Sequence, residues 1–142
     1  MTLSNLSELI LDFHVSQLNQ KSMSITFVNN DLPQTIEHLD EGEYTYKTKI
    51  EFPTKFIIKV AGKGPRDTQI DDQGNILKDM CIKLTNITVD GLSCSPEYVY
   101  HHINLHTDSG QVVQSNYWGF NGYVELNFDY TNSFFWALDC SC

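Results

Sequence analysis

The chain has 142 residues, which is enough for one domain with a substantial core and too few for two ordinary domains. Its composition, 41% hydrophobic and 19% charged, is that of a folded protein and excludes a disordered chain. The formal net charge of −9 argues against nucleic acid or an anionic membrane surface as a partner, because both attract lysine and arginine.

In chain order, the first element is Leu9–Val15, whose pattern leaves a strand and part of a short helix both open. Ser24–Val28 is predicted to be a strand, and the polar stretch Asn29–Glu41 to be the longest surface loop. Glu43–Phe52 alternates with period two, with Tyr44, Tyr46, Thr48, Ile50 and Phe52 on one face and Glu43, Thr45, Lys47, Lys49 and Glu51 on the other, which predicts a half-buried strand. Lys55–Ala61 repeats that alternation and predicts the next strand.

The second half of the chain continues with runs rich in β-branched and aromatic residues. The further strands predicted there are Cys81–Val89, Tyr98–His106, Gln111–Tyr117, Tyr123–Tyr130 and Phe134–Asp139. Gly, Asn and Asp clusters separate them, and the turn Asp108–Gly110 is the clearest hairpin. About eight or nine strands at this spacing predict an all-β fold, an antiparallel two-sheet β-sandwich of jelly-roll type.

The sequence also predicts the domain organisation and the location of the protein. We expect residues 1–22 to form an N-terminal arm or an edge strand and residues 23–142 to form a single β-sandwich domain. Residues 1–22 lack a basic start followed by an apolar stretch, so we expect no secretory signal and synthesis in the cytoplasm. The cysteines are expected to be free thiols, with Cys81 in the core and a Cys81–Cys94 disulfide left open.

An acidic loop between Arg66 and Asp79 is the first candidate site. Its carboxylates Asp67, Asp71, Asp72 and Asp79 are the kind of oxygen ligands that calcium prefers, although the spacing of an EF-hand is absent. The alternative is that these aspartates are solvated turn formers. Calcium is therefore a candidate ion, and no cofactor is required by the sequence.

A cluster of aromatic and amide residues from Asn116 to Tyr123 is the second candidate site. Exposed rings stack on the C–H groups of sugars while amides hydrogen-bond their hydroxyls, so the cluster suits a glycan. The alternative is that Trp118 and Phe120 belong to the core. His102 and His106 would share a strand face but lie about 13 Å apart, too far for a shared metal ion.

Motifs of catalysis are lacking from the sequence: no G-x-S-x-G elbow, no H-E-x-x-H and no phosphate-binding glycine loop occurs. We therefore expect no enzyme. A polysaccharide hydrolase or lyase stays as an alternative, because paired carboxylates meet in space rather than in sequence.

Several of these segments together resemble a known group of proteins. They are the spaced series from Asp67 to Asp79, Ile87–Gly91, Tyr117–Gly122 and Phe134–Trp136. In this combination they resemble small β-sandwich virion proteins of tailed bacteriophages, which are in turn similar to calcium-dependent carbohydrate-binding modules. The resemblance covers roughly residues 55–138.

The resemblance implies a non-enzymatic virion component, either a capsid decoration or a module associated with the tail or fibre. Its partners would be other virion proteins or copies of itself, with no nucleic acid and no membrane. Carried over residue by residue, Asp67, Asp71 and Asp79 would be cation ligands, and Tyr117, Trp118 and Asn121 would contact a glycan. The alternative function is a calcium-assisted carbohydrate-binding module for glycans of host surfaces or the environment.

Overall fold

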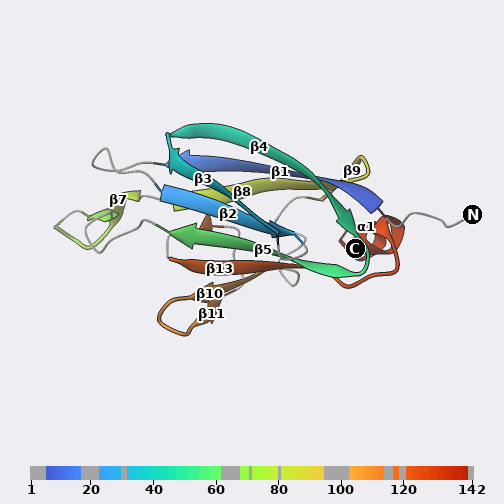
Figure 1. The fold of residues 1–142 in the computed structure, drawn as a ribbon. Coiled ribbons are helices and arrows are strands. Elements are labelled where there is room, and N and C mark those ends of the chain that lie inside the picture. Colours follow the sequence, from blue (N-terminus) through green and yellow to red (C-terminus); the bar gives the residue numbers. More distant parts are fainter. Residues whose placement is uncertain are drawn as a thin grey trace, which may run out of the picture.

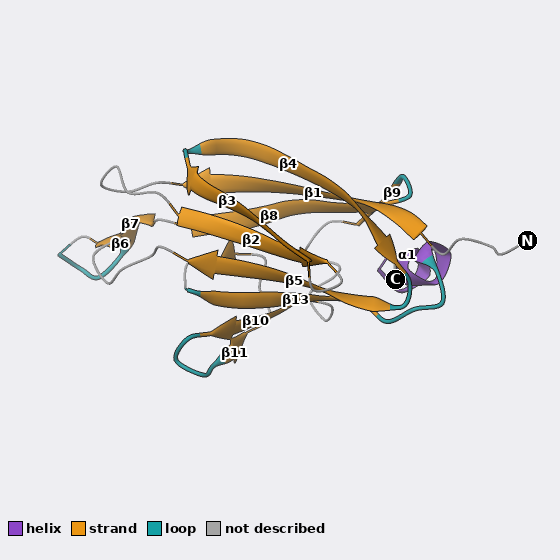
Figure 2. Ribbon diagram, in the orientation of Figure 1, coloured by secondary structure: helices purple, strands orange, loops and turns teal. Residues whose placement is uncertain are grey.

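The computed structural model describes residues 6–16, 23–29, 32–61, 68–70, 72–79, 81–94, 103–113, 117–118 and 121–140. These residues form thirteen strands and one helix (Figures 1 and 2). The strands are β1 (Leu6–Ser16), β2 (Met23–Asn29), β3 (Leu32–Leu39), β4 (Gly42–Glu51), β5 (Thr54–Ala61), β6 (Thr68–Ile70), β7 (Ile76–Asp79), β8 (Cys81–Val89), β9 (Leu92–Cys94), β10 (Ile103–Thr107), β11 (Val112–Val113), β12 (Tyr117–Trp118) and β13 (Gly122–Phe128). The helix α1 spans Ser133–Cys140.

Two antiparallel sheets pack face to face and confirm the predicted all-β sandwich. In the described residues, one sheet has five strands in the order β12-β8-β1-β4, with β9 also pairing with β8. The other has six strands in the order β11-β10-β13-β5-β2-β3. A separate hairpin of β6 and β7 projects from one end of the sandwich (Figure 1).

The core fills the space between the sheets, because alternate positions on the long strands turn inward. The buried side chains come from both sheets and include Leu9, Leu11, Phe13, Phe27, Ile58, Leu84, Val124 and Leu126. Aromatic pairs join the layers: the Tyr46 ring of β4 stacks on Phe27 of β2, with centroids 3.7 Å apart. The alternation predicted for β4 and β5 is therefore the pattern that builds this core.

The first strand, β1, is an inner strand of the five-stranded sheet. It pairs with β4 on one side and with β8 on the other, both antiparallel. Its inward side chains from Leu9 to Val15 are fully buried, so the helix considered for this stretch does not form. The expected arm or edge strand is therefore wrong for residues 6–16, while residues 1–5 and 17–22 lie outside the described residues.

Strand β3 lies within the stretch Asn29–Glu41, which was predicted to be a loop. It forms the edge of the six-stranded sheet and pairs with β2, where the Thr26 and Thr35 hydroxyls hydrogen-bond at 2.9 Å. Within the part of the chain that the structure describes, β3 has a partner strand on one side alone, and Pro33, which has no N–H to donate, is tolerated at such an edge. The polar composition of this stretch therefore led to the wrong prediction of a loop.

Helix α1 replaces the strand predicted over Phe134–Asp139. The Asn132 side chain caps it, because Asn132 Oδ1 accepts the backbone N–H of Phe135 at 3.2 Å. Trp136 is buried against Phe128, with ring centroids 5.8 Å apart. The Asn132 cap and the buried Trp136 ring both favour the two-turn helix over a strand. In the described part of the chain no helix has the length and apolar character needed to span a membrane.

The predicted hairpin at Asp108–Gly110 is confirmed: it joins β10 to β11, which pair antiparallel. The strand predicted over Gln111–Tyr117 is instead two short pieces, β11 in the six-stranded sheet and β12 in the other. The chain therefore changes sheet between Val113 and Tyr117. Residues 98–102 of another predicted strand lie outside the described residues.

Cys81 and Cys94 are both buried, and no disulfide joins them. The placement of Cys81 in the core is confirmed, and the disulfide left open between these two residues does not form.

Candidate functional site

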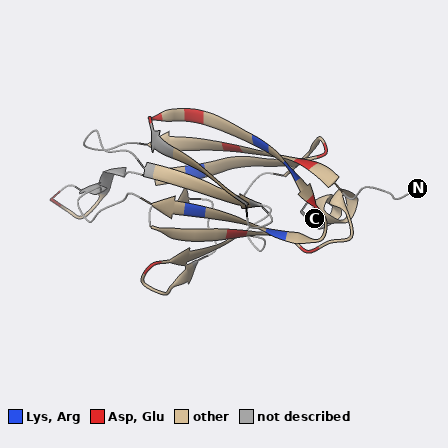
Figure 3. Cartoon of the chain, viewed as in Figure 1, with Lys and Arg blue, Asp and Glu red and all other residues tan. Residues whose placement is uncertain are grey.

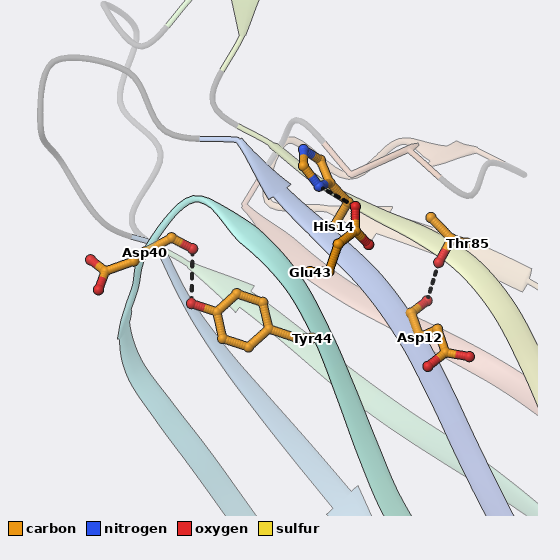
Figure 4. Close-up of polar contacts among 6 residues, drawn as sticks. All are labelled: Asp12, His14, Asp40, Glu43, Tyr44 and Thr85. Carbon is orange, nitrogen blue, oxygen red and sulfur yellow. Dashed lines mark hydrogen bonds and ion pairs between the residues drawn. The ribbon is translucent and has the colours of Figure 1, made fainter.

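The outer face of the five-stranded sheet carries polar side chains that bond to one another (Figure 4). His14 Nδ1 lies 2.8 Å from Glu43 Oε1. The Thr45 hydroxyl donates to the Asp12 carboxylate at 2.7 Å, and the Thr85 hydroxyl donates to the Asp12 backbone carbonyl at 3.0 Å. A ligand on this face would have to compete with these bonds.

The outer face of the six-stranded sheet is different because aromatic rings lie on it. Along β13, Val124, Leu126 and Phe128 are buried. The alternate positions, Tyr123 and Glu125, therefore turn outward. The strand register sets the neighbours of these two residues. Tyr123 lies opposite His106 of β10 and Lys59 of β5, and Glu125 lies opposite Asn104 of β10. We call the surface formed by Lys59, Asn104, His106, Tyr123 and Glu125 the β13 face.

The centre of the β13 face is a stacked pair of rings. The His106 and Tyr123 rings are almost parallel, with an interplanar angle of 6° and centroids 4.5 Å apart. Tyr123 remains 39% exposed, so the pair is accessible from solvent. Stacking covers one face of each ring and restrains both side chains, so the edges of the rings and the second face of Tyr123, on the side of Lys59, form a preorganised platform with little side-chain freedom left to lose when a ligand binds.

Polar groups border the platform on both sides. The Glu125 carboxylate lies 3.6 Å from His106 Nε2, and both side chains are half-buried. Both signs of charge occur on the neighbouring strands of this face, with basic residues on β5 and an acidic residue on β13 (Figure 3). The β13 face therefore offers a carboxylate, an amide and an ammonium group around an apolar surface, without a strong net attraction for an anion or a cation.

Gly122 lets β13 approach β10 at this platform. A Cβ atom at this position would overlap the backbone carbonyl oxygen of His106, and that atom cannot move aside without breaking the strand pairing. The glycine is therefore required for the close pairing of the two strands that carry the rings.

Asn121 lies at the same end of the sheet. Its backbone carbonyl accepts the N–H of Asp108, which ties the start of β13 to the β10–β11 turn. Its half-buried side chain precedes Tyr123 by two residues. Of the three predicted glycan contacts, Asn121 is the one that lies beside the β13 face.

The other two predicted glycan contacts lie on β12, in the opposite sheet. Trp118 is fully buried and pairs with Ile82 of β8, so its ring cannot stack on a sugar. This part of the prediction is wrong, and the core role considered for Trp118 is correct. Tyr117 is 40% exposed and lies opposite Lys83, away from Tyr123.

The acidic loop is partly described. Asp67 and Asp71 lie outside the described residues. Asp72 is exposed in the turn between β6 and β7, and Asp79 ends β7 at the position opposite Thr68. Among the residues whose structure is described, no three His, Cys, Asp or Glu side chains are arranged to hold a metal ion. A calcium site at this loop stays a prediction.

The β13 face was missed by sequence reasoning because its residues come from three strands that are far apart in the sequence. Two signals pointed toward it: Asn104 and His106 share one face of a predicted strand, and Tyr123 follows an Asn-Gly turn. Only the register of β10 against β13 brings these residues together.

Comparison with known proteins gives a likeness of fold. No protein-family model matches the chain. No curated protein matches it. Among solved structures, the chain is similar to the selenomethionine form of vCBM60. That structure is described in connection with a circular permutation that links two families of calcium-dependent carbohydrate-binding modules. The TM-score is 0.52 at 12% identity, over 85% of this chain and 90% of that one. A structure of vCBM60 in complex with galactobiose also matches, with a TM-score of 0.45 at 14% identity, over 84% of this chain and 97% of the other.

Proposed function

We propose that this domain is a non-catalytic carbohydrate-binding module that holds a neutral glycan on the β13 face. The observation that carries the proposal is the stacked His106–Tyr123 pair on an outer sheet face. Sugar rings present C–H groups on one face and hydroxyls at the rim, and the platform with its polar border matches both. The platform would stack on the sugar while Glu125, Asn104 and Lys59 bond its hydroxyls.

Two further observations support this proposal. The chain shares its fold with a calcium-dependent carbohydrate-binding module. The net charge of −9 repels anionic polysaccharides, which leaves neutral glycans as the favoured class.

The virion role implied by the sequence resemblance remains a prediction, as does location in a virion. An exposed arm exchanged between copies would have favoured it, because such arms build large interfaces. The inner position of β1 instead favours a free-standing binding domain. The hydrolase or lyase alternative likewise remains a prediction.

Whether calcium assists glycan binding is tested by the chelator experiment described below. The candidate donors are Asp67, Asp71, Asp72 and Asp79 around the β6–β7 hairpin.

A glycan array followed by titration calorimetry tests the proposal. The wild-type domain should bind neutral glycans, and Tyr123→Ala should weaken binding roughly tenfold or more, since it removes the stacking surface. Tyr117→Ala is the matched control: its ring has nearly the same exposure, 40% against 39%, but lies on the other sheet. Addition of a chelator separates a calcium-assisted mode from a direct one.

The proposal fails if no neutral glycan binds in calcium or in chelator, or if the two tyrosine variants lose affinity equally. Release of shorter sugars from a polysaccharide during the same incubation would contradict the non-catalytic part.

A further inference from the structure

A concave surface lies at the far end of β13 from the stacked rings. Pro53, Asp129, Tyr130, Thr131 and Phe135 line an open cleft of about 550 Å³. Pro53 comes from the β4–β5 turn, the next three from the segment after β13, and Phe135 from α1. Figure 1 shows these three segments meeting at the same end of the sandwich.

The lining of this cleft combines rings with polar groups. Phe135 is 50% exposed, and Tyr130 is half-buried with its ring packed against the core. The Asp129 carboxylate and the Thr131 hydroxyl are both exposed beside them. Aromatic walls with a carboxylate and a hydroxyl at the rim suit a sugar ring better than a purely apolar ligand.

A continuous row of outward side chains joins the cleft to the β13 face. Tyr123, Glu125 and Asn127 alternate with buried residues along β13, and the row continues to Asp129 in the cleft. Lys55 of β5 lies opposite Asn127 and flanks the row between the two ends. Six residues of extended chain put Tyr123 and Asp129 about 20 Å apart, a span longer than one sugar ring.

We infer that the cleft is a second sugar-binding subsite and that the row from Tyr123 to Phe135 takes a linear oligosaccharide chain. This inference rests on the proposed function and names its ligand class: a neutral chain of several sugars rather than a single terminal sugar. The two aromatic ends anchor the chain, and the polar row between them bonds its hydroxyls. Linking two weak sites through one ligand raises affinity by effective concentration.

Calorimetry with cello-, xylo- and galacto-oligosaccharides, from disaccharides to hexasaccharides, tests the inference. For the backbone that binds, affinity should rise roughly tenfold or more from the disaccharide to the hexasaccharide. Phe135→Ala should abolish that rise while leaving disaccharide binding dependent on Tyr123. Phe134→Ala is the matched control: its neighbouring ring is 59% exposed on the same helix but lines a different hollow with Leu92 and Leu138.

The outcomes separate the two claims. Disaccharide binding that needs Tyr123 but gains nothing with chain length overturns the second subsite and leaves the proposed function intact. A hexasaccharide affinity that is equal for wild type, Phe134→Ala and Phe135→Ala overturns it as well. Absence of binding to all three series and to every neutral glycan of the array overturns both claims. Thermal unfolding of each variant confirms that the exposed substitutions leave the domain folded.

Discussion

Asp90, in the tight turn between β8 and β9, is the residue where one substitution tests several features of the fold. Its carboxylate accepts the backbone N–H of Glu8 at 2.9 Å, and its own N–H donates to the Glu8 carbonyl at 3.0 Å. The Ser7 and Ser133 hydroxyls also bond the carboxylate. Asp90 therefore ties the turn to the start of β1 and to the first residue of α1.

The backbone conformation of Asp90 also determines how much a substitution changes the free energy of unfolding. Its φ is 51°, in the left-handed region, and Gly91 follows at 79°. Such a pair is typical of the two-residue hairpin turn that Asp-Gly sequences favour. An alanine in this conformation costs about 1–2 kcal/mol, whereas glycine does not pay that cost.

We predict the following order of destabilisation. Because Asp90 itself is exposed, the three bonds to its carboxylate contribute roughly 0.5 kcal/mol each, the low end of the usual range. Asp tolerates the left-handed region better than alanine but still bears about 0.5 kcal/mol of its cost, so Asp90→Ala should lower the free energy of unfolding by about 2.5 kcal/mol, and Asp90→Gly, which relieves that cost, by about 1 kcal/mol. Asp90→Asn keeps an acceptor and the left-handed conformation, so it should lose less than about 1 kcal/mol.

Urea unfolding followed by fluorescence measures these differences, with Asp108→Ala in the β10–β11 turn as the control that should stay within about 0.5 kcal/mol. Equal losses for Asp90→Ala and Asp90→Gly would refute the backbone argument. A loss for Asp108→Ala as large as that for Asp90→Ala would refute the role of the carboxylate.

The pH dependence of the same variants provides an independent check. Partial burial raises the pKa of the Asp90 carboxyl, but the bonds from Ser7, the Glu8 backbone and Ser133 outweigh it and hold the pKa below its ordinary value of 3.8. A lowered pKa stabilises the folded state above the unfolded value, and this contribution is lost as the pH falls through the folded value. The gap between wild type and Asp90→Asn should therefore be full above about pH 4 and shrink below it. A gap that is constant across the acid range would contradict this.

Three further predictions concern packing. Gly122→Ala should destabilise the domain by more than about 2 kcal/mol in urea unfolding, because the added methyl group overlaps the His106 carbonyl; a near-neutral result would contradict the close pairing of β10 and β13. Asn132→Ala should cost about 1 kcal/mol and speed amide exchange within α1, and unchanged exchange would mean that the cap is not needed. Trp118→Ala should cost roughly 3–5 kcal/mol of stability, and a fully stable variant would contradict the burial of this ring in the core.

The sheets were readable from the sequence where alternation was strict. Glu43–Phe52 and Lys55–Ala61 show period two because each strand has one face on the core, and both form strands. The turns at Asp90-Gly91 and Asp108–Gly110 were readable for the same local reason, since they depend on residues that tolerate positive φ or close a hairpin.

Other elements could not be predicted because their structure depends on distant neighbours. Strand β3 is polar since it pairs on one side and lies at a sheet edge. The sequence of α1 is as apolar as a strand, and its helical form depends on Asn132 and on a place for Trp136 beside Phe128. Composition alone does not show whether a helix cap or the β propensity of the residues decides the secondary structure.

The candidate site was the least predictable part. Exposure of an aromatic residue is a property of the packed fold, so the sequence could not tell that Trp118 is buried while Tyr123, five residues later, is exposed. The partners of Tyr123 are set by strand register, which brings His106 and Lys59 to it from β10 and β5.

The most direct test of the glycan-binding account is a residue-by-residue NMR titration of the wild-type domain with a neutral disaccharide that binds. The account predicts saturable shifts at His106, Tyr123 and Glu125, with resonances of Tyr117 and Lys83 on the other sheet unchanged. Shifts centred on Tyr117 and Lys83, with none at Tyr123, would contradict it.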